Sequence, residues 1–291
     1  MRIFCMEIKR ILLSRRNQIF IIAGLLISLI VPVYSIHSVM YRYTESDGTE
    51  VLLRGLDAIR YRNDLYSDYD GEVTTEKLED ALSQYQTGVT KSGGLSVDDE
   101  SFPNDLYQEY IAPVRQLTNQ IEEAYTIPSD GFWTWTPLEQ IPAEEMSGFY
   151  DKVENYRYDI IDYEYGGNQS VIDTAQKLSQ RIERPFQTYG AFTFESMEFF
   201  GLTIFLLIIL CGAIAAPAFS ENYENGSDYI LRCTKYGRIH FSISKLSALF
   251  TILAVFYLVC TGIHIGILNT AFGWESLHTS VQMFGSIVSL V

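Results

Sequence analysis

Few residues of this chain are of the kinds that perform catalysis. Its 291 residues include only four histidines and four cysteines, and the block from residue 36 to residue 195 has one histidine, His37, and no cysteine. The sequence contains no GxSxG, HExxH or GxxxxGK[ST] motif, and no zinc spacing of cysteine and histidine. We therefore expect no enzyme, no bound metal and no cofactor.

A stronger functional pattern lies between residues 219 and 238. Glu221 and Glu224 precede Gly226, which breaks a helix, and a short apolar turn ending at Leu231 precedes the basic residues. Separated acidic and basic groups around a helix break suit contact with a protein partner. We interpret this segment as a docking loop.

Three uncharged stretches must position this loop. They lie between Arg16 and Arg42, between Glu198 and Glu221, and between Lys245 and Glu275. At 1.5 Å rise per residue each is long enough to cross about 30 Å of hydrocarbon, where a backbone must bond internally as a helix. Buried core helices of a soluble protein are the alternative. A cleaved signal peptide is a further alternative for the first stretch, but its hydrophobic run is long for one.

A fourth uncharged stretch covers residues 276–291 and then the chain stops. It is too short to cross a bilayer and resembles the first part of a span. We therefore expect a partial fourth transmembrane helix and a truncated C-terminus.

The charges are divided unevenly along the chain and predict an orientation. Residues 1–35 have a net charge of +4, residues 36–195 of −18 and residues 196–291 of −1. Basic residues flank the cytoplasmic ends of spans, which places the N-terminus and the docking loop in the cytoplasm and the acidic block outside. So acidic a chain is a poor nucleic-acid binder.

Apolar spacing predicts helices on both sides of the membrane. Residues 1–16 place Phe4, Ile8 and Ile11 on one face among basic residues, which indicates an amphipathic helix along the inner leaflet; a solvated basic leader is the alternative. In the acidic block, spacings of three and four predict helices near residues 78–85, 106–121, 146–163 and 171–182. We read residues 128–142 as a loop.

Three further features of the acidic block have competing interpretations. Its fifteen tyrosines fit either a ligand-binding surface or, as we favour, the seams of a helical core. Trp133 and Trp135 fit the outer membrane interface or a buried cluster equally well. Asp64, Asp68 and Asp70 invite a calcium hypothesis, but the EF-hand pattern fails at its ends, so a solvated loop is preferred.

The docking loop and the order of elements carry a resemblance. An amphipathic N-terminal helix, a large domain between spans one and two, and a Glu, Gly, Leu, Thr and Arg pattern before a lysine such as Lys245 resemble the membrane subunits of ABC-2-type ABC transporters. Lys235 stands where that family often has a proline after the threonine, and the family usually has six spans.

The resemblance implies a transmembrane subunit of an ATP-driven exporter of a peptide, lipid or other amphipathic substrate, in a bacterial plasma membrane. A separate ABC ATPase subunit would supply energy, and a second membrane subunit, identical or different, would complete the transporter in the lipid bilayer. By resemblance, the ATPase-coupling residues are Glu221, Glu224, Gly226, Leu231, Thr234 and Arg238.

The predicted organisation is an all-α membrane protein with a large, mainly helical extracellular domain. Its segments are a cytoplasmic amphipathic helix (1–16), transmembrane helix 1 (17–38), the extracellular helical domain (39–195), transmembrane helix 2 (196–218), a cytoplasmic coupling loop (219–244), transmembrane helix 3 (245–270) and the start of transmembrane helix 4 (276–291).

Two other function classes compete with transport. The chain could be a membrane-anchored receptor or sensor whose extracellular domain binds a peptide or protein partner, or a scaffold for assembly or immunity. Within the spans, Gly212, Gly262 and Gly266 could allow close helix packing. His264 could mark a pathway through the membrane or make a packing hydrogen bond.

Overall fold

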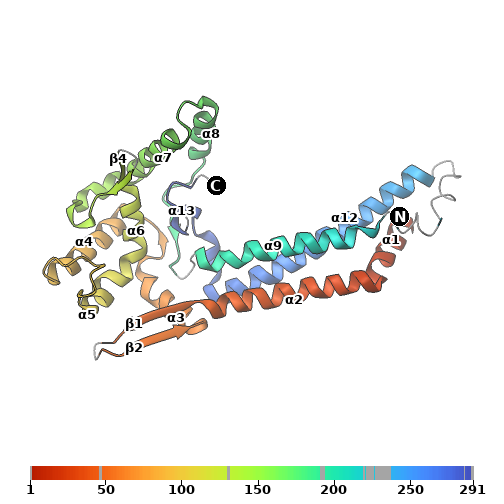
Figure 1. Cartoon of the computed structure of the whole chain (residues 1–291), viewed down its shortest axis with the longest axis horizontal. Coiled ribbons are helices and arrows are strands. Elements are labelled where there is room, and N and C mark those ends of the chain that lie inside the picture. The colour runs from red at the N-terminus through yellow and green to blue at the C-terminus, as the bar shows by residue number, and fades with distance from the viewer. Residues whose placement is uncertain are drawn as a thin grey trace. The chain divides into compact units, whose positions relative to one another are not determined.

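A computed structural model gives the fold of this chain (Figure 1). It describes residues 2–45, 48–129, 132–190, 194–218, 220, 226, 237–284 and 286–289. The described part is mostly helical and divides into two compact units. We call residues 1–38 and 195–271 the apolar-helix unit, and residues 39–194 and 272–291 the inserted unit.

The described residues of the apolar-helix unit form one amphipathic helix and three apolar helices. These are α1 (Arg2–Leu13), α2 (Arg15–Ser38), α9 (Phe194–Ala215) and α12 (Gly237–Phe272), the last residue of which belongs to the inserted unit. Their bounds lie within a few residues of the expected amphipathic helix and first two spans. Helix α12 begins eight residues before the expected third span, inside the expected coupling loop.

Two described helices are long and apolar enough to cross a membrane. They are Arg15–Ser38 and Ile239–Phe272, while the apolar part of α9, Phe199–Ala215, is shorter. Only 22% and 28% of the most apolar windows of the two long helices are buried. Large apolar side chains such as Ile19, Phe205 and Phe250 are instead exposed. A soluble protein would bury such helices in its core, so these exposed faces favour contact with lipid.

The three apolar helices pack together through a narrow core. Leu207 and Ile214 of α9 meet Leu249, Ile252 and Phe256 of α12 in one cluster, and Figure 1 shows α2, α9 and α12 side by side. The closest approach is at Gly24 of α2, where a Cβ atom would lie 2.3 Å from Cζ of Phe256. Only a glycine lets the ring come so close.

The inserted unit is built around helices whose apolar faces form a second core. The helices are α3 (Leu56–Tyr66), α4 (Thr75–Lys91), α5 (Asn104–Leu106), α6 (Arg115–Ala124), α7 (Phe149–Tyr165), α8 (Gln169–Ser179) and α13 (Val281–Phe284). Leu82 of α4, Leu117 and Ile121 of α6, and Phe149 and Val153 of α7 are all buried there. These residues of the predicted stripes therefore face inward, whereas Tyr163, at the end of the 146–163 stripe, is 58% exposed.

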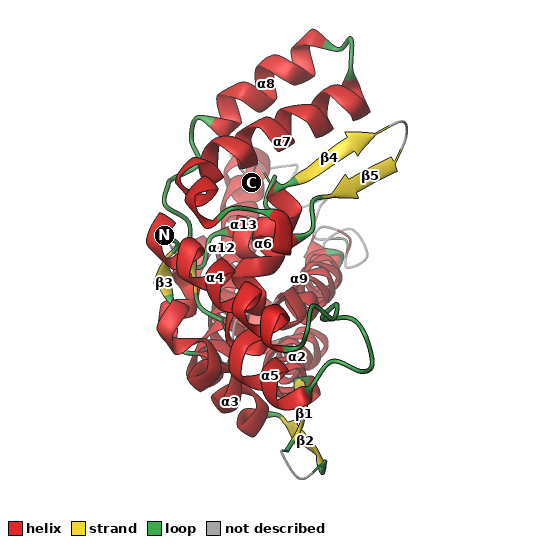
Figure 2. Ribbon diagram, turned by 90° about the vertical axis from the view of Figure 1, so that its left-hand side faces the viewer, coloured by secondary structure: helices red, strands yellow, loops and turns green. Residues whose placement is uncertain are grey.

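Local signals explain where several of these helices begin and end. The Thr74 hydroxyl accepts a hydrogen bond from Lys77 N–H at 3.4 Å and so caps α4. Pro113 lies in a 3₁₀ turn (Ala112–Val114) that follows a π-helical turn (Tyr107–Ile111) and precedes α6, so the predicted 106–121 helix is interrupted. Figure 2 shows α7 and α8 joined by a short turn at Gly166–Gly167.

Among the described residues, two antiparallel hairpins and one antiparallel pair of strands far apart in sequence correct the all-α expectation. They pair β1 (Met40–Thr44) with β2 (Glu50–Arg54), β3 (Gly71–Glu72) with β6 (Gln187–Thr188), and β4 (Thr126–Ser129) with β5 (Phe132–Trp135). The last lies in the segment expected to be a loop (Figure 2). Trp135 is 60% exposed, so it belongs to no buried cluster. The remaining turns are 3₁₀ segments at Ser67–Tyr69, Leu138–Gln140, Ala143–Gly148 and Trp274–His278.

The C-terminal segment differs from the expected start of a fourth transmembrane helix. Its described residues form a 3₁₀ turn, the four-residue helix α13 and a non-helical tail. Met283 and Ile287 are buried in the core of the inserted unit. The apolar side chains that resembled half a span are explained by packing within that unit.

Candidate functional site

The base of the predicted docking loop is the part of the apolar-helix unit where polar and basic residues gather. Ala218 lies directly before the loop and Leu249 lies in α12 after it, and both share a hydrophobic cluster with Ile11 of α1. Asn17, at the start of α2, donates a hydrogen bond from Nδ2 to the Ile11 carbonyl at 3.1 Å. These contacts fix the amphipathic helix to both flanks of the loop.

Charged side chains are buried at this base. Glu7 is 6% exposed and lies one helical turn before Ile11, and its Oε2 is 2.9 Å from Nη2 of Arg10. Lys245 is fully buried one turn before Leu249, with its ammonium 5.6 Å from the ring centroid of Phe241. Buried charges cost free energy unless they are paired or solvated by polar groups, so they are unusual for a purely structural helix end.

The predicted coupling residues are described only in part. Gly226 has a φ of 67°, a left-handed conformation that favours glycine. Arg238 lies in the first turn of α12. Glu221, Glu224, Leu231 and Thr234 lie outside the described residues. Glu7 and Asn17 are not among the site residues predicted from the sequence, although Glu7 is the one acid among the basic residues of the N-terminal segment.

His264, in the middle of α12, makes a packing hydrogen bond. It is fully buried, and its Nδ1 is 3.2 Å from the Thr203 hydroxyl of α9. The Thr203 hydroxyl also lies 3.1 Å from the Phe199 carbonyl, one turn earlier in α9. The bond between His264 and Thr203 links α9 to α12, in agreement with the packing alternative.

The glycines expected to allow close helix packing do not make the close contact. A Cβ atom on Gly212, Gly262 or Gly266 would meet no described atom within 4 Å, whereas Gly24 lies against the Phe256 ring. Gly24 was not predicted as a packing position, because a single glycine in a long apolar run lacks the regular spacing of small residues that marks a helix contact.

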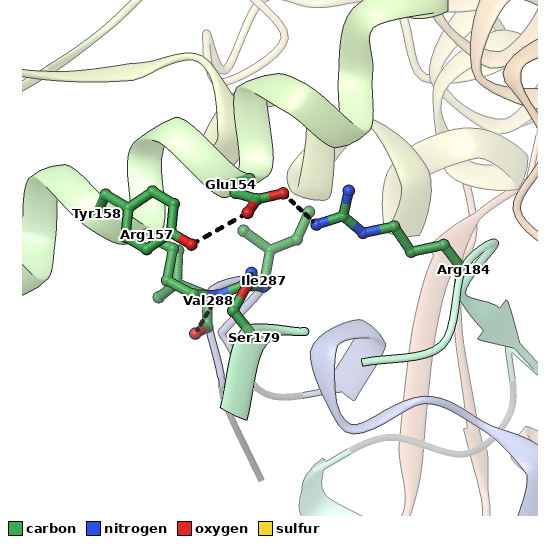
Figure 3. A network of polar contacts seen from close by, with 7 residues as sticks. All are labelled: Glu154, Arg157, Tyr158, Ser179, Arg184, Ile287 and Val288. Carbon is green, nitrogen blue, oxygen red and sulfur yellow. Dashed lines mark hydrogen bonds and ion pairs between the residues drawn. The ribbon is translucent and has the colours of Figure 1, made fainter. Parts of the chain in front are cut away.

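A network of polar contacts ties the C-terminal tail to the inserted unit (Figure 3). The guanidinium of Arg157 on α7 is buried and donates to the carbonyls of Val288 at 3.0 Å and Ile287 at 3.2 Å, and to the Ser179 hydroxyl at 3.2 Å. The Glu123 carboxylate accepts from the Ser286 hydroxyl and from the Ile287 N–H.

The electrostatics of this network follow from its contacts. Burial lowers the pKa of Arg157. Beside it, Arg184 donates to Glu154 at 2.7 Å, and this hydrogen bond lowers the pKa of the carboxyl (Figure 3). Since its hydrogen bonds go to main-chain carbonyls and a serine, Arg157 serves to hold the tail.

A cavity of about 240 Å³ lies in the inserted unit between the β4–β5 hairpin and α7. Tyr125, Tyr156, Lys152 and Asp159 are among its lining residues, and the Lys152 ammonium is 5.0 Å from the Tyr125 ring centroid. Burial raises the pKa of Tyr125 to about 12, so its hydroxyl stays neutral. Aromatic and charged groups together could bind a small polar ligand.

Asp70, one of the acidic residues considered for calcium, has a structural role. The Asp70 carboxylate accepts a hydrogen bond from Gly190 N–H at 2.8 Å, and burial raises the pKa of this carboxyl. Among the described residues, no group of three or more histidine, cysteine, aspartate or glutamate side chains could hold a metal ion.

Comparisons with known proteins give no relative from which a function could be transferred. The chain matches no protein-family model, no curated protein and no solved structure.

Proposed function

We propose that this chain is the membrane subunit of an ATP-driven ABC-2-type exporter, energised by a separate ATPase. The observation that carries the proposal is the packing of Ile11 of α1 against Ala218 and Leu249, which flank the predicted docking loop. A force applied to the loop would reach α1, α9 and α12 together, since all three contribute to one cluster.

The composition of the apolar-helix unit supports membrane insertion. Two helices are long enough to span, their apolar side chains are largely exposed, and a shorter apolar helix packs with them in the same cluster. Because the sequence has no phosphate-binding loop, the energy would come from a partner. The cargo class that we propose, a peptide, lipid or other amphipathic molecule, rests on the family resemblance alone.

Co-purification from membranes tests the proposal. The full chain with an affinity tag, extracted in mild detergent, should bring an ABC ATPase with it. Glu224→Gln combined with Arg238→Gln should reduce the recovered ATPase at least fivefold. Arg60→Gln, on an exposed surface of the inserted unit, should leave the ATPase unchanged. Recovery of the chain without any ATPase in both wild type and control would contradict the proposal.

A receptor is the second candidate, and the cavity beside Tyr125 favours it. In that case the inserted unit would bind a small polar molecule or peptide with no ATPase present. Lys152→Met would then abolish ligand binding, whereas in a transport subunit changes in the docking loop would reduce ATPase recovery.

A further inference from the structure

A polar cavity of about 320 Å³ lies at the base of the docking loop. Its lining includes Arg10 of α1, Ser14 between α1 and α2, and Arg16 of α2. It also includes Ser220, before α12, and Leu249 of α12. All of them belong to the apolar-helix unit. The space is therefore bounded by the N-terminal helix and by the flanks of the loop.

The charges around this cavity suit an anion. Two arginines line it and, among its lining residues, no acidic side chain is present. Glu7 pairs with Arg10 from outside the lining, which still leaves Arg16, whose side chain is exposed, and the hydroxyls of Ser14 and Ser220. Two arginines and two hydroxyls can hold a phosphate group.

A separate apolar cavity of about 320 Å³ lies further along the same helices. Ile21 and Leu25 of α2 and Val255 and Val259 of α12 line it, together with Ile8 and Leu12 of α1. Every lining residue except Thr251 is apolar. A space with such walls suits a hydrocarbon chain and not a hydrated ligand.

The order of the two cavities is the same along both long helices. On α2 the polar cavity uses residues 16–17 and the apolar cavity residues 21–25, and on α12 the polar cavity uses residue 249 and the apolar cavity residues 251–259. At 1.5 Å per residue, Arg16 and Leu25 are about 14 Å apart along the axis. A phospholipid has the same sequence of charged head and apolar chain.

We propose that the end of this unit binds an anionic phospholipid, with its phosphate between Arg10 and Arg16 and an acyl chain in the cavity lined by Leu25 and Val255. Basic pockets between membrane helices are suited to anionic head groups. The proposal rests on the membrane insertion in the proposed function and does not require the ATPase, so the two can fail separately.

Native mass spectrometry of the purified full chain tests this site with phosphatidylglycerol and with phosphatidylcholine of the same acyl chains. Phosphatidylglycerol should be retained preferentially. Arg10→Gln and Arg16→Gln should each weaken retention about fivefold. Arg15→Gln is the matched control, because Arg15 is adjacent and exposed but does not line the cavity, and it should weaken retention less. Equal losses for Arg15 and Arg16 would overturn the proposal.

Two further arms separate the lipid from a free anion and from surface attraction. Inorganic phosphate at millimolar concentration should not displace phosphatidylglycerol, since the chain contributes to binding; displacement would assign the cavity to a soluble anion and overturn the proposal. Val255→Trp should fill the apolar cavity and reduce retention while both arginines remain. Phe250→Trp, at a position 72% exposed, is its control. Unchanged retention in Val255→Trp would also overturn it.

Discussion

Arg157 is among the largest fully buried side chains of the described residues. Its side chain donates two hydrogen bonds to a tail that follows it by some 130 positions in sequence, and a third to Ser179. A buried guanidinium without a direct carboxylate partner costs free energy. The hydrogen bonds to the carbonyls of Ile287 and Val288 offset this cost. The residue therefore acts as an anchor for the tail.

Replacing this anchor should loosen the tail. Arg157→Met keeps much of the volume but leaves the carbonyls of Ile287 and Val288 and the Ser179 hydroxyl without their donor, which should cost about 3 kcal/mol of unfolding free energy. Thermal unfolding of the full chain in detergent, with hydrogen exchange over residues 281–289, measures both effects. Arg60→Met, whose side chain is 74% exposed, should change neither. Slow exchange retained in Arg157→Met would contradict the anchor role.

Glu154 gives a pH dependence of known sign. The hydrogen bond from Arg184 lowers its pKa in the folded chain below the unfolded value of 4.5. The pair therefore stabilises the fold above about pH 4.5, and this contribution disappears as the pH falls through the lowered pKa. Since both side chains are about one-third exposed, it should not exceed about 1 kcal/mol.

Glu154→Gln tests this dependence by difference. The variant should unfold at a lower temperature than wild type at pH 7, and the gap should close as the pH falls below the lowered pKa of Glu154, where the wild-type carboxyl is protonated. Melting curves across this range report the gap. A constant gap at all pH values would show that Glu154 stabilises the unit by packing instead.

At the scale of elements, the close contact between α2 and α12 depends on the absence of a side chain at Gly24 of α2. A Cβ atom on Gly24 would lie 2.3 Å from Cζ of Phe256, closer than packed atoms can stand. Gly24→Ala should therefore destabilise the apolar-helix unit by about 1–3 kcal/mol. Thermal melting in detergent measures the loss.

Two controls make this result specific. Gly201→Ala on α9 meets no described atom within 4 Å and should melt like wild type. Gly24→Ala combined with Phe256→Leu should recover part of the loss, because the smaller side chain frees the space. If Gly201→Ala were as damaging as Gly24→Ala, the contact with Phe256 would not be responsible, since alanine raises helix propensity at both positions.

The sequence predicts the helices of this chain better than its hairpins. The apolar spacing over residues 146–163 and 171–182 predicts α7 and α8, because the period of an α-helix is visible in local sequence. The hairpin of β1 and β2 was missed, although Tyr41 and Tyr43 alternate with polar residues in a strand pattern. Strands of two to five residues leave little periodicity to read.

The candidate site was predictable only in outline. Basic residues before α2 predict a cytoplasmic end there, but the contact of Ile11 with Ala218 and Leu249 joins segments that are more than 200 residues apart. In the sequence, Glu7 resembles any charged residue of an exposed helix. It is buried because Ile11, one turn later on the same helix face, packs inward. Burial of a charge depends on tertiary packing, which local patterns do not contain.

At the scale of the whole molecule, a partition of charge organises the chain. The segment before α2 is basic, the block from residue 36 to residue 195 has a net charge of −18, and the two units divide the chain at nearly these positions. The C-terminal tail escaped this reasoning, because its apolar residues are equally suited to lipid and to a protein core. Packing of Met283 and Ile287 in the inserted unit decides between them.

The same partition makes a prediction about sidedness. If the basic end of α2 faces the cytoplasm, the inserted unit lies outside. Two single-cysteine chains report on it, with the other native cysteines replaced by serine: one keeps the exposed Cys5 of α1, and the other carries Ser83→Cys on the exposed face of α4. In intact cells a membrane-impermeant maleimide should label position 83 and leave Cys5 unlabelled until the cells are opened. Labelling of Cys5 first would reverse the orientation, and with it the access of any cytoplasmic ATPase to the docking loop.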